Sequence, residues 1–331
     1  MKKFKKNFLN LLLFNFRISF YLFLTIIFLI FLQNYIFFYF SNIFCFILIL
    51  SIGIIHGSLD NLKGKQLLKI LKIKNQFYFY VSYIILALAV IVMWLIFPSL
   101  TLLTFLIIAS FHFGKEDSSY VLWDKKIMFP ELMYFIRGSI IVIAPLMLNF
   151  NETVSIFSNL LPVESNFINI IYQLKISNEN LSLLLIVPFI IIFCTGFYIH
   201  ANGVAGSLPR LTGYDPFIFD FMSVILLNYS FNPLVAFTIY FCFLHSPRHS
   251  LILINEIDKN DFKKGFQIFI KKAFPLTFIT AIIFLLSLLG LSKYYVLDNA
   301  ITKVIFIGLA SLTFPHILLE YLLEKNEKQR N

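Results

Sequence analysis

The stretch FYFYVSYIILALAVIVMWLIF, residues 77–97, decides the fold, because it contains no charged residue and is long enough for a membrane-crossing helix. A transmembrane α-helix needs about 20 consecutive, mostly apolar residues. The rest of the chain has the same character. Hydrophobic residues make up 59% of its 331 residues, charged residues make up 13%, and the mean hydropathy is +0.85. A soluble domain carries roughly 25% charged residues. The chain is therefore predicted to be all-α, a polytopic integral membrane helical bundle.

Nine further apolar stretches resemble membrane spans in length and composition. The stretch from Ile18 to Ile55 is too long for one helix, so it is divided near Gln33 and Asn34 into candidate spans at 18–33 and 36–56. The others lie at 99–114, 132–148, 181–199, 215–229, 232–252, 273–292 and 300–320. Because two of these stretches are short, we expect eight to ten transmembrane helices.

Basic residues between the candidate spans predict the orientation of the chain. Cytoplasmic loops carry an excess of Lys and Arg. With the N-terminus inside, the inside segments hold 22 basic residues and the outside segments hold 3. We therefore expect one multi-pass domain, residues 1–331, in the cell (inner) membrane, with a basic cytoplasmic N-terminus at 1–17 and a charged cytoplasmic tail at 321–331. The net charge of +10 follows this loop pattern and does not indicate a nucleic-acid partner.

Six histidines are the candidate functional residues, because ionisable groups within membrane spans are costly and usually serve a function. They are His56, His112, His200, His245, His249 and His316. With the orientation set by the basic loops, all six fall in the cytoplasmic part of the membrane. A common depth is what a shared site requires.

The segment Leu-His-Ser-Pro-Arg-His, residues 244–249, carries two of these histidines four positions apart. This spacing places His245 and His249 on one face of a helix, as in the helical zinc motif HExxH. Pro247 removes a backbone hydrogen bond and is expected to open the helix there. Arg248, between the histidines, is a candidate partner for a carboxylate such as Asp60 or Asp117. Arg137, near the start of its span, is expected to extend its charge to the membrane surface.

Carboxylates follow two of the other histidines. Asp60 follows His56 by four positions, and Glu116 and Asp117 follow His112. A metal-bound histidine usually donates its second ring N–H to a carboxylate or carbonyl, so these acids are candidates for orienting the ligands.

Neutral imidazoles without a thiolate suit iron, copper or zinc, and so few histidines favour one metal. The residues themselves leave three interpretations open. The first is a non-haem metal enzyme. The second is a proton-coupled membrane transporter that uses the same histidines and carboxylates as a relay. The third is a bis-histidine haem protein.

Four segments resemble, in order and approximate spacing, motifs of the bacterial Brp/Blh-like β-carotene 15,15′-dioxygenases. GIIHGSLD at 53–60 is similar to their PHGALD segment, and SFHFGKED at 110–117 is similar to WHFGxxD. HSPRH at 245–249 and the Pro-His pair at 315–316 also have counterparts. The sequence departs from the pattern at Ile55, where the family usually has proline, and at Asn61, where the family often has histidine.

The resemblance implies an enzyme that cleaves β-carotene, or a related carotenoid, at its central double bond with O₂ and releases two molecules of retinal, often for a rhodopsin in the same cell. It implies one Fe(II) bound by His56, His112, His245 and His249. Asp60, Glu116, Asp117 and Arg248 are the residues expected around these ligands, and the resemblance places His316 beside the site. The other implied partner is membrane lipid, through which a polyene would reach the site. His200 would cap a helix and would not bind the metal.

Overall fold

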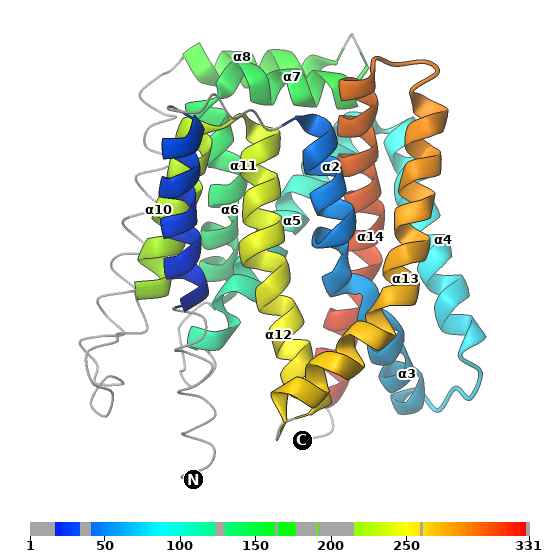
Figure 1. The fold of residues 1–331 in the computed structure, drawn as a ribbon. Coiled ribbons are helices and arrows are strands. Elements are labelled where there is room, and N and C mark those ends of the chain that lie inside the picture. The colour runs from blue at the N-terminus through cyan, green and yellow to red at the C-terminus, as the bar shows by residue number, and fades with distance from the viewer. Residues whose placement is uncertain are drawn as a thin grey trace. The chain divides into compact units, whose positions relative to one another are not determined.

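A computed structural model describes most of the chain (Figure 1). The described residues are 17–33, 41–122, 130–162, 165–176, 190, 215–258 and 261–328. Every secondary-structure element among them is helical, which confirms the predicted all-α class. The chain divides into two compact units, each assembled from separate stretches of sequence. The prediction of one domain over residues 1–331 stays a prediction.

Unit 1 comprises residues 1–41, 109–158 and 164–248. Its helices cover Arg17–Gln33, α6 Pro130–Leu148, α7 Phe150–Leu160, α8 Asn166–Ile176, α10 Asp215–Ser230, α11 Pro233–Tyr240 and the π turn η2 Phe241–His245. Within this unit α10 packs against α6 and α11. Asn232 begins α11 by accepting a hydrogen bond from the Val235 amide, and Pro233 occupies the first turn, where its missing N–H costs little.

Unit 2 comprises residues 42–108, 159–163 and 249–331. Its helices are α2 Asn42–Ser51, the 3₁₀ segment η1 Gly53–Leu59, α3 Asp60–Ile70, α4 Phe77–Ile96, α13 Phe262–Leu291 and α14 Leu297–Lys328. Helix α14 packs against α2, α3, α4 and α13, and Figure 1 shows it beside α2 and α13. Helices α5, Pro98–Leu122, and α12, Ser246–Ile257, contribute residues to both units, and the last two residues of α7 also belong to unit 2.

Five described helices are long and apolar enough to cross a membrane. They are Phe77–Ile96, Pro98–Ser118, Pro130–Leu148, Phe262–Leu291 and Leu297–Asn326. The bent pair Asn42–Ile55 and Gly57–Ile70 would make a sixth. The predicted count of eight to ten is not confirmed. The candidates at 18–33 and 215–229 form helices that are short for a span, and the candidate at 181–199 lies almost wholly outside the described residues.

The helices of unit 2 differ in how much of their apolar surface is covered. Half of the apolar window of α14 is buried, whereas only 6% of the corresponding windows of α4 and α13 is buried. Leu95 on α4, for example, is 79% exposed. Contiguous apolar surface of this extent is unfavourable in water and suits contact with lipid. The arrangement supports a membrane protein in which α14 is an inner helix of its unit.

Two histidine motifs lie where the helical geometry changes. His56 lies in η1, the 3₁₀ segment between α2 and α3. His245 is the last residue of the π turn η2, and Pro247 follows in the first turn of α12. The helical conformation continues without a break from α11 through η2 into α12, so Pro247 lies inside a helical stretch, and the wider π turn directly before it agrees with the expectation that this proline opens the helix. Mid-helix 3₁₀ segments and π turns are frequent at functional sites.

Helices α5 and α6 touch at their backbones in unit 1. A Cβ atom added to Gly114 would lie 1.7 Å from the Tyr134 carbonyl oxygen, and one added to Gly138 would lie 1.6 Å from the Ser110 carbonyl oxygen. Small residues allow membrane helices to approach this closely. This contact fixes the segment of α5 that carries His112.

Gly138→Ala is therefore expected to destabilise the protein by about 1–3 kcal/mol or more, because the added methyl group forces the two backbones apart. The midpoint of thermal unfolding in detergent measures the effect. Gly290→Ala on α13 is the matched control, since a Cβ there meets nothing within 4 Å. Equal midpoints for the two variants would contradict the close helix contact.

Candidate metal centre

In unit 1, two histidine rings lie close together in a buried position. The ring centroids of His112, on α5, and His245, at the end of η2, are 5.3 Å apart, and the ring planes are inclined by 70°. His112 is 3% exposed and His245 is fully buried. The structure thus brings together two of the histidines that the sequence analysis assigned to a metal.

Asp117 faces His245 from α5. Its Oδ1 lies 3.4 Å from His245 Nδ1, and its Oδ2 accepts a hydrogen bond of 2.6 Å from the Tyr240 hydroxyl. Asp117 follows His112 in sequence and is one of the carboxylates expected to orient a ligand. The histidine that it faces, His245, belongs to another helical segment. A carboxylate at Nδ1 leaves Nε2 as the nitrogen available for a metal.

Two arginines share one carboxylate in the same unit. Asp220 Oδ2 lies 2.5 Å from Arg137 Nη2 and 2.7 Å from Arg248 Nη1, and its Oδ1 accepts a bond of 2.9 Å from Arg248 Nη2. Ser118 accepts from Arg137 (2.9 Å), and Ser19 accepts from Arg248 (2.6 Å). All five side chains are buried.

This network corrects one expectation and refines another. Arg137 does not extend to the membrane surface, because its guanidinium is buried, paired with Asp220 and stacked over the Phe217 ring at 4.1 Å. Arg248 binds Asp220 most closely, and it also pairs with Asp117 at 3.7 Å, one of the two carboxylates expected as its partner. Buried charges need such partners, and the partners come from helices distant in sequence.

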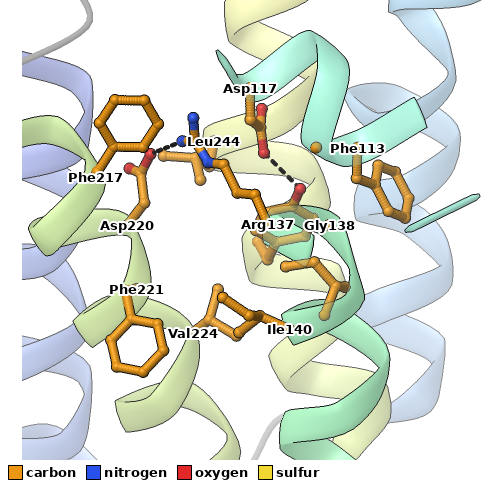
Figure 2. A pocket seen from close by; sticks show the side chains of 13 residues that line it. Phe113, Asp117, Arg137, Gly138, Ile140, Phe217, Asp220, Phe221, Val224 and Leu244 are labelled. Carbon is orange, nitrogen blue, oxygen red and sulfur yellow. Dashed lines mark hydrogen bonds and ion pairs between the residues drawn. The ribbon is translucent and has the colours of Figure 1, made fainter. Parts of the chain in front are cut away.

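A small cavity lies beside this network (Figure 2). Figure 2 shows Arg137 and Asp220 joined at its wall, with Asp117 and the aromatic rings of Phe113 and Phe217 nearby. Its unfilled volume is about 360 Å³ including its open side, and its core holds about one water-sized molecule. The space is thus too narrow for a carotenoid.

In unit 2, a second pair of histidine rings has nearly the same geometry. The ring centroids of His249, on α12, and His316, on α14, are 5.4 Å apart, and the planes are inclined by 73°. Each residue is 2% exposed. Asp60 lies 2.8 Å from His316 Nδ1 and accepts a hydrogen bond of 2.8 Å from the Tyr83 hydroxyl. Asp60, like Asp117, approaches a histidine of another helix.

Glu320 completes this group. Its Oε1 lies 3.7 Å from His316 Nε2 and 3.9 Å from His249 Nε2, and it pairs with Lys63 Nζ at 2.6 Å. Glu320 was not among the predicted residues, although its position four residues after His316 puts both on one face of α14. Tyr83, Tyr240 and the role of Asp220 were not predicted either.

The remaining predicted residues are Glu116, His56 and His200. Glu116 is half-buried on α5, next to Asp117. His56 belongs to η1, and the structure describes only its backbone. His200 lies outside the described residues.

The donor groups fit a non-haem metal such as Fe(II). Imidazole nitrogen and carboxylate oxygen are its usual ligands, and two histidines with one carboxylate form a common iron-binding set. In each unit one imidazole has a carboxylate at Nδ1, which is the usual second contact of a metal-bound histidine. The histidines of both pairs are buried. Ionisable groups in membrane-spanning segments usually face the protein interior and have a function there.

Fold and site together define a helical protein of the membrane type with two pairs of buried histidines, in each of which one ring has a carboxylate at Nδ1. A family model described as beta-carotene 15,15'-dioxygenase matches residues 47–324, and the chain belongs to this family. The match includes all four motifs on which the resemblance was based. The Beta-carotene 15,15'-dioxygenase of uncultured marine bacterium 66A03 is 27% identical over 275 residues, which are 82% of this chain and 90% of that protein. No solved structure matches the chain significantly.

Proposed function

We propose that this protein is a membrane dioxygenase that cleaves β-carotene at its central 15,15′ double bond with O₂. One C=C bond is broken, each carbon receives one oxygen atom, and two molecules of retinal result. The observation that carries the proposal is the family match over residues 47–324, because it contains every histidine of the candidate centre. The similarity to a protein named for this reaction supports the same substrate.

We further propose that His56, His112, His245 and His249 bind one Fe(II), as the motif resemblance implies. Bound iron would supply the binding and activation of O₂. Asp117 would hold His245 with Nε2 directed to the metal, and the Tyr240 hydroxyl would hold Asp117. No acid or base is needed to grip a hydrocarbon chain, so apolar surroundings suffice for the substrate.

The exposed apolar surfaces of α4 and α13 support access for a substrate that dissolves in lipid. We propose a location in the cell (inner) membrane with both termini on the cytoplasmic side, as the distribution of basic residues favours. The product would then enter the same membrane, where a retinal-binding rhodopsin would be its natural acceptor.

Production of the protein in bacterial cells that make β-carotene tests the proposal. We expect the cells to lose colour and chromatography of their extracts to detect retinal, with two molecules formed per β-carotene consumed. Unequal apocarotenal fragments would instead indicate cleavage at another bond. Membranes that contain the protein but form no retinal would rule out the proposed reaction.

A further inference from the structure

In unit 2, Tyr83, Asp60 and His316 form a hydrogen-bonded chain across three helices. The Tyr83 hydroxyl donates to Asp60 Oδ2 at 2.8 Å, and Asp60 Oδ1 lies 2.8 Å from His316 Nδ1. An ionised carboxylate can only accept hydrogen bonds, so Nδ1 is a protonated nitrogen of His316. When the ring is neutral, Nε2 therefore carries the lone pair that a metal requires.

Unit 1 contains a similar but looser arrangement around a proposed metal ligand, with 3.4 Å between the carboxylate and the imidazole nitrogen. The Tyr240 hydroxyl donates to Asp117 Oδ2, and Asp117 Oδ1 faces His245 Nδ1. In both units the oriented histidine lies beside a second one, at 5.3 Å and 70° in unit 1 and at 5.4 Å and 73° in unit 2. Since His245 belongs to the proposed ligand set, its counterpart His316 has the same claim to a place in it.

The surroundings of His316 Nε2 support this assignment independently. Nε2 of His316 and Nε2 of His249 both approach Glu320 Oε1, at 3.7 and 3.9 Å. These separations exceed a hydrogen bond but match two ligands on one ion, since each ligand lies about 2.0–2.2 Å from the metal. Lys63 Nζ balances the charge of the buried carboxylate. Two imidazoles and one carboxylate form a familiar set for non-haem iron.

We propose that His316 is a ligand of the metal through Nε2, alongside His249, and that Asp60 and Tyr83 are positioning residues for it. The inference rests on the proposed metal-dependent function and extends it. Sequence resemblance had placed His316 only near the site.

Metal binding by the purified full-length protein in detergent tests this assignment without use of activity. Iron per chain is measured by elemental analysis. The affinity for Co(II) and its d–d absorption report the number and kind of ligands. The variants are His316→Asn and Tyr83→Phe, with Tyr80→Phe as control. Asparagine keeps an amide N–H near the position of Nδ1 for Asp60 while removing Nε2. Tyr80 lies on the same helix as Tyr83 and is 38% exposed.

His316→Asn is expected to weaken Co(II) binding at least about 100-fold and to change the absorption bands. Tyr83→Phe should weaken binding about 10-fold, as is typical when a residue that orients a ligand is lost. Tyr80→Phe should bind as the wild type does. A lowered unfolding midpoint with unchanged cobalt affinity and spectrum would overturn the assignment, because it would reveal a purely structural role.

The outcomes separate this inference from the proposed reaction. Wild-type protein that binds metal in a His316-dependent way but forms no retinal would contradict the reaction and support the ligand. Wild-type protein that forms retinal, while His316→Asn keeps full metal affinity, would overturn the ligand alone. A wild-type chain that binds neither iron nor cobalt overturns both.

Discussion

Alanine in place of any one of the four histidines proposed first as Fe(II) ligands is expected to lower retinal formation at least about 100-fold. These residues are His56, His112, His245 and His249. Loss of a residue that merely orients a ligand typically costs 10–100-fold in affinity or activity, and loss of a ligand itself should cost more. Chromatography of extracts from β-carotene-producing cells measures the effect, with retinal normalised to the amount of protein in the membrane.

Tyr294→Ala serves as the control for this series. Its ring is 82% exposed, so its removal tests whether loss of an aromatic side chain alone lowers activity. Substantial retinal formation by two or more of the four histidine variants would refute the proposed ligand set. Metal analysis of inactive variants adds a second criterion, because a variant with normal iron content has lost activity for another reason.

Helix positions were predictable where apolar runs have sharp ends. The span expected at 77–97 corresponds to α4, Phe77–Ile96, and the one expected at 132–148 corresponds to α6, Pro130–Leu148. Hydropathy measures apolar character rather than helicity. The predicted end of a helix is therefore wrong where the helix continues into polar sequence. Helix α14 continues to Lys328, beyond the expected end at 320, because its polar last turns remain helical.

The candidate centre was predictable as a set of residues but not as a set of contacts. Periodicity relates residues within one helix, such as His316 and Glu320. It says nothing of Asp60 and His316, which are 256 positions apart and meet only because α3 packs against α14. The prediction that Arg137 extends to the membrane surface is wrong for the same reason, since its partner Asp220 lies 83 positions away in the sequence.

A signal for the buried charge network was nevertheless present in the sequence. Arg137 and Asp220 both occur within apolar candidate spans, and ionisable groups in spans usually pair with one another. Two opposite charges in separate spans therefore predict contact between those spans. Helices α6 and α10, which carry them, do pack together in unit 1.

Replacement of Asp220 is expected to have the largest effect on folding. Asp220→Ala removes the carboxylate shared by Arg137 and Arg248 and leaves two buried guanidinium groups without their main counter-charge. Breaking a buried ion pair typically costs about 3–5 kcal/mol, and here two pairs are lost together. We expect a low yield of folded protein and a clearly reduced thermal unfolding midpoint in detergent.

The loss of Asp220 is also expected to weaken metal binding at the candidate centre. A loss of packing alone would not have this second effect. Arg248 Nη1 lies 3.7 Å from Asp117 Oδ1, the atom that faces His245 Nδ1. Among the described residues, Asp117 is the other carboxylate with which Arg248 pairs, and a shift of Arg248 toward it would weaken the orientation of His245. Folded Asp220→Asn protein should therefore bind Co(II) less tightly, whereas Asp298→Asn, an exposed change at the start of α14, should not. Wild-type stability and wild-type cobalt affinity in Asp220→Asn would show that the two arginines find sufficient partners without this carboxylate.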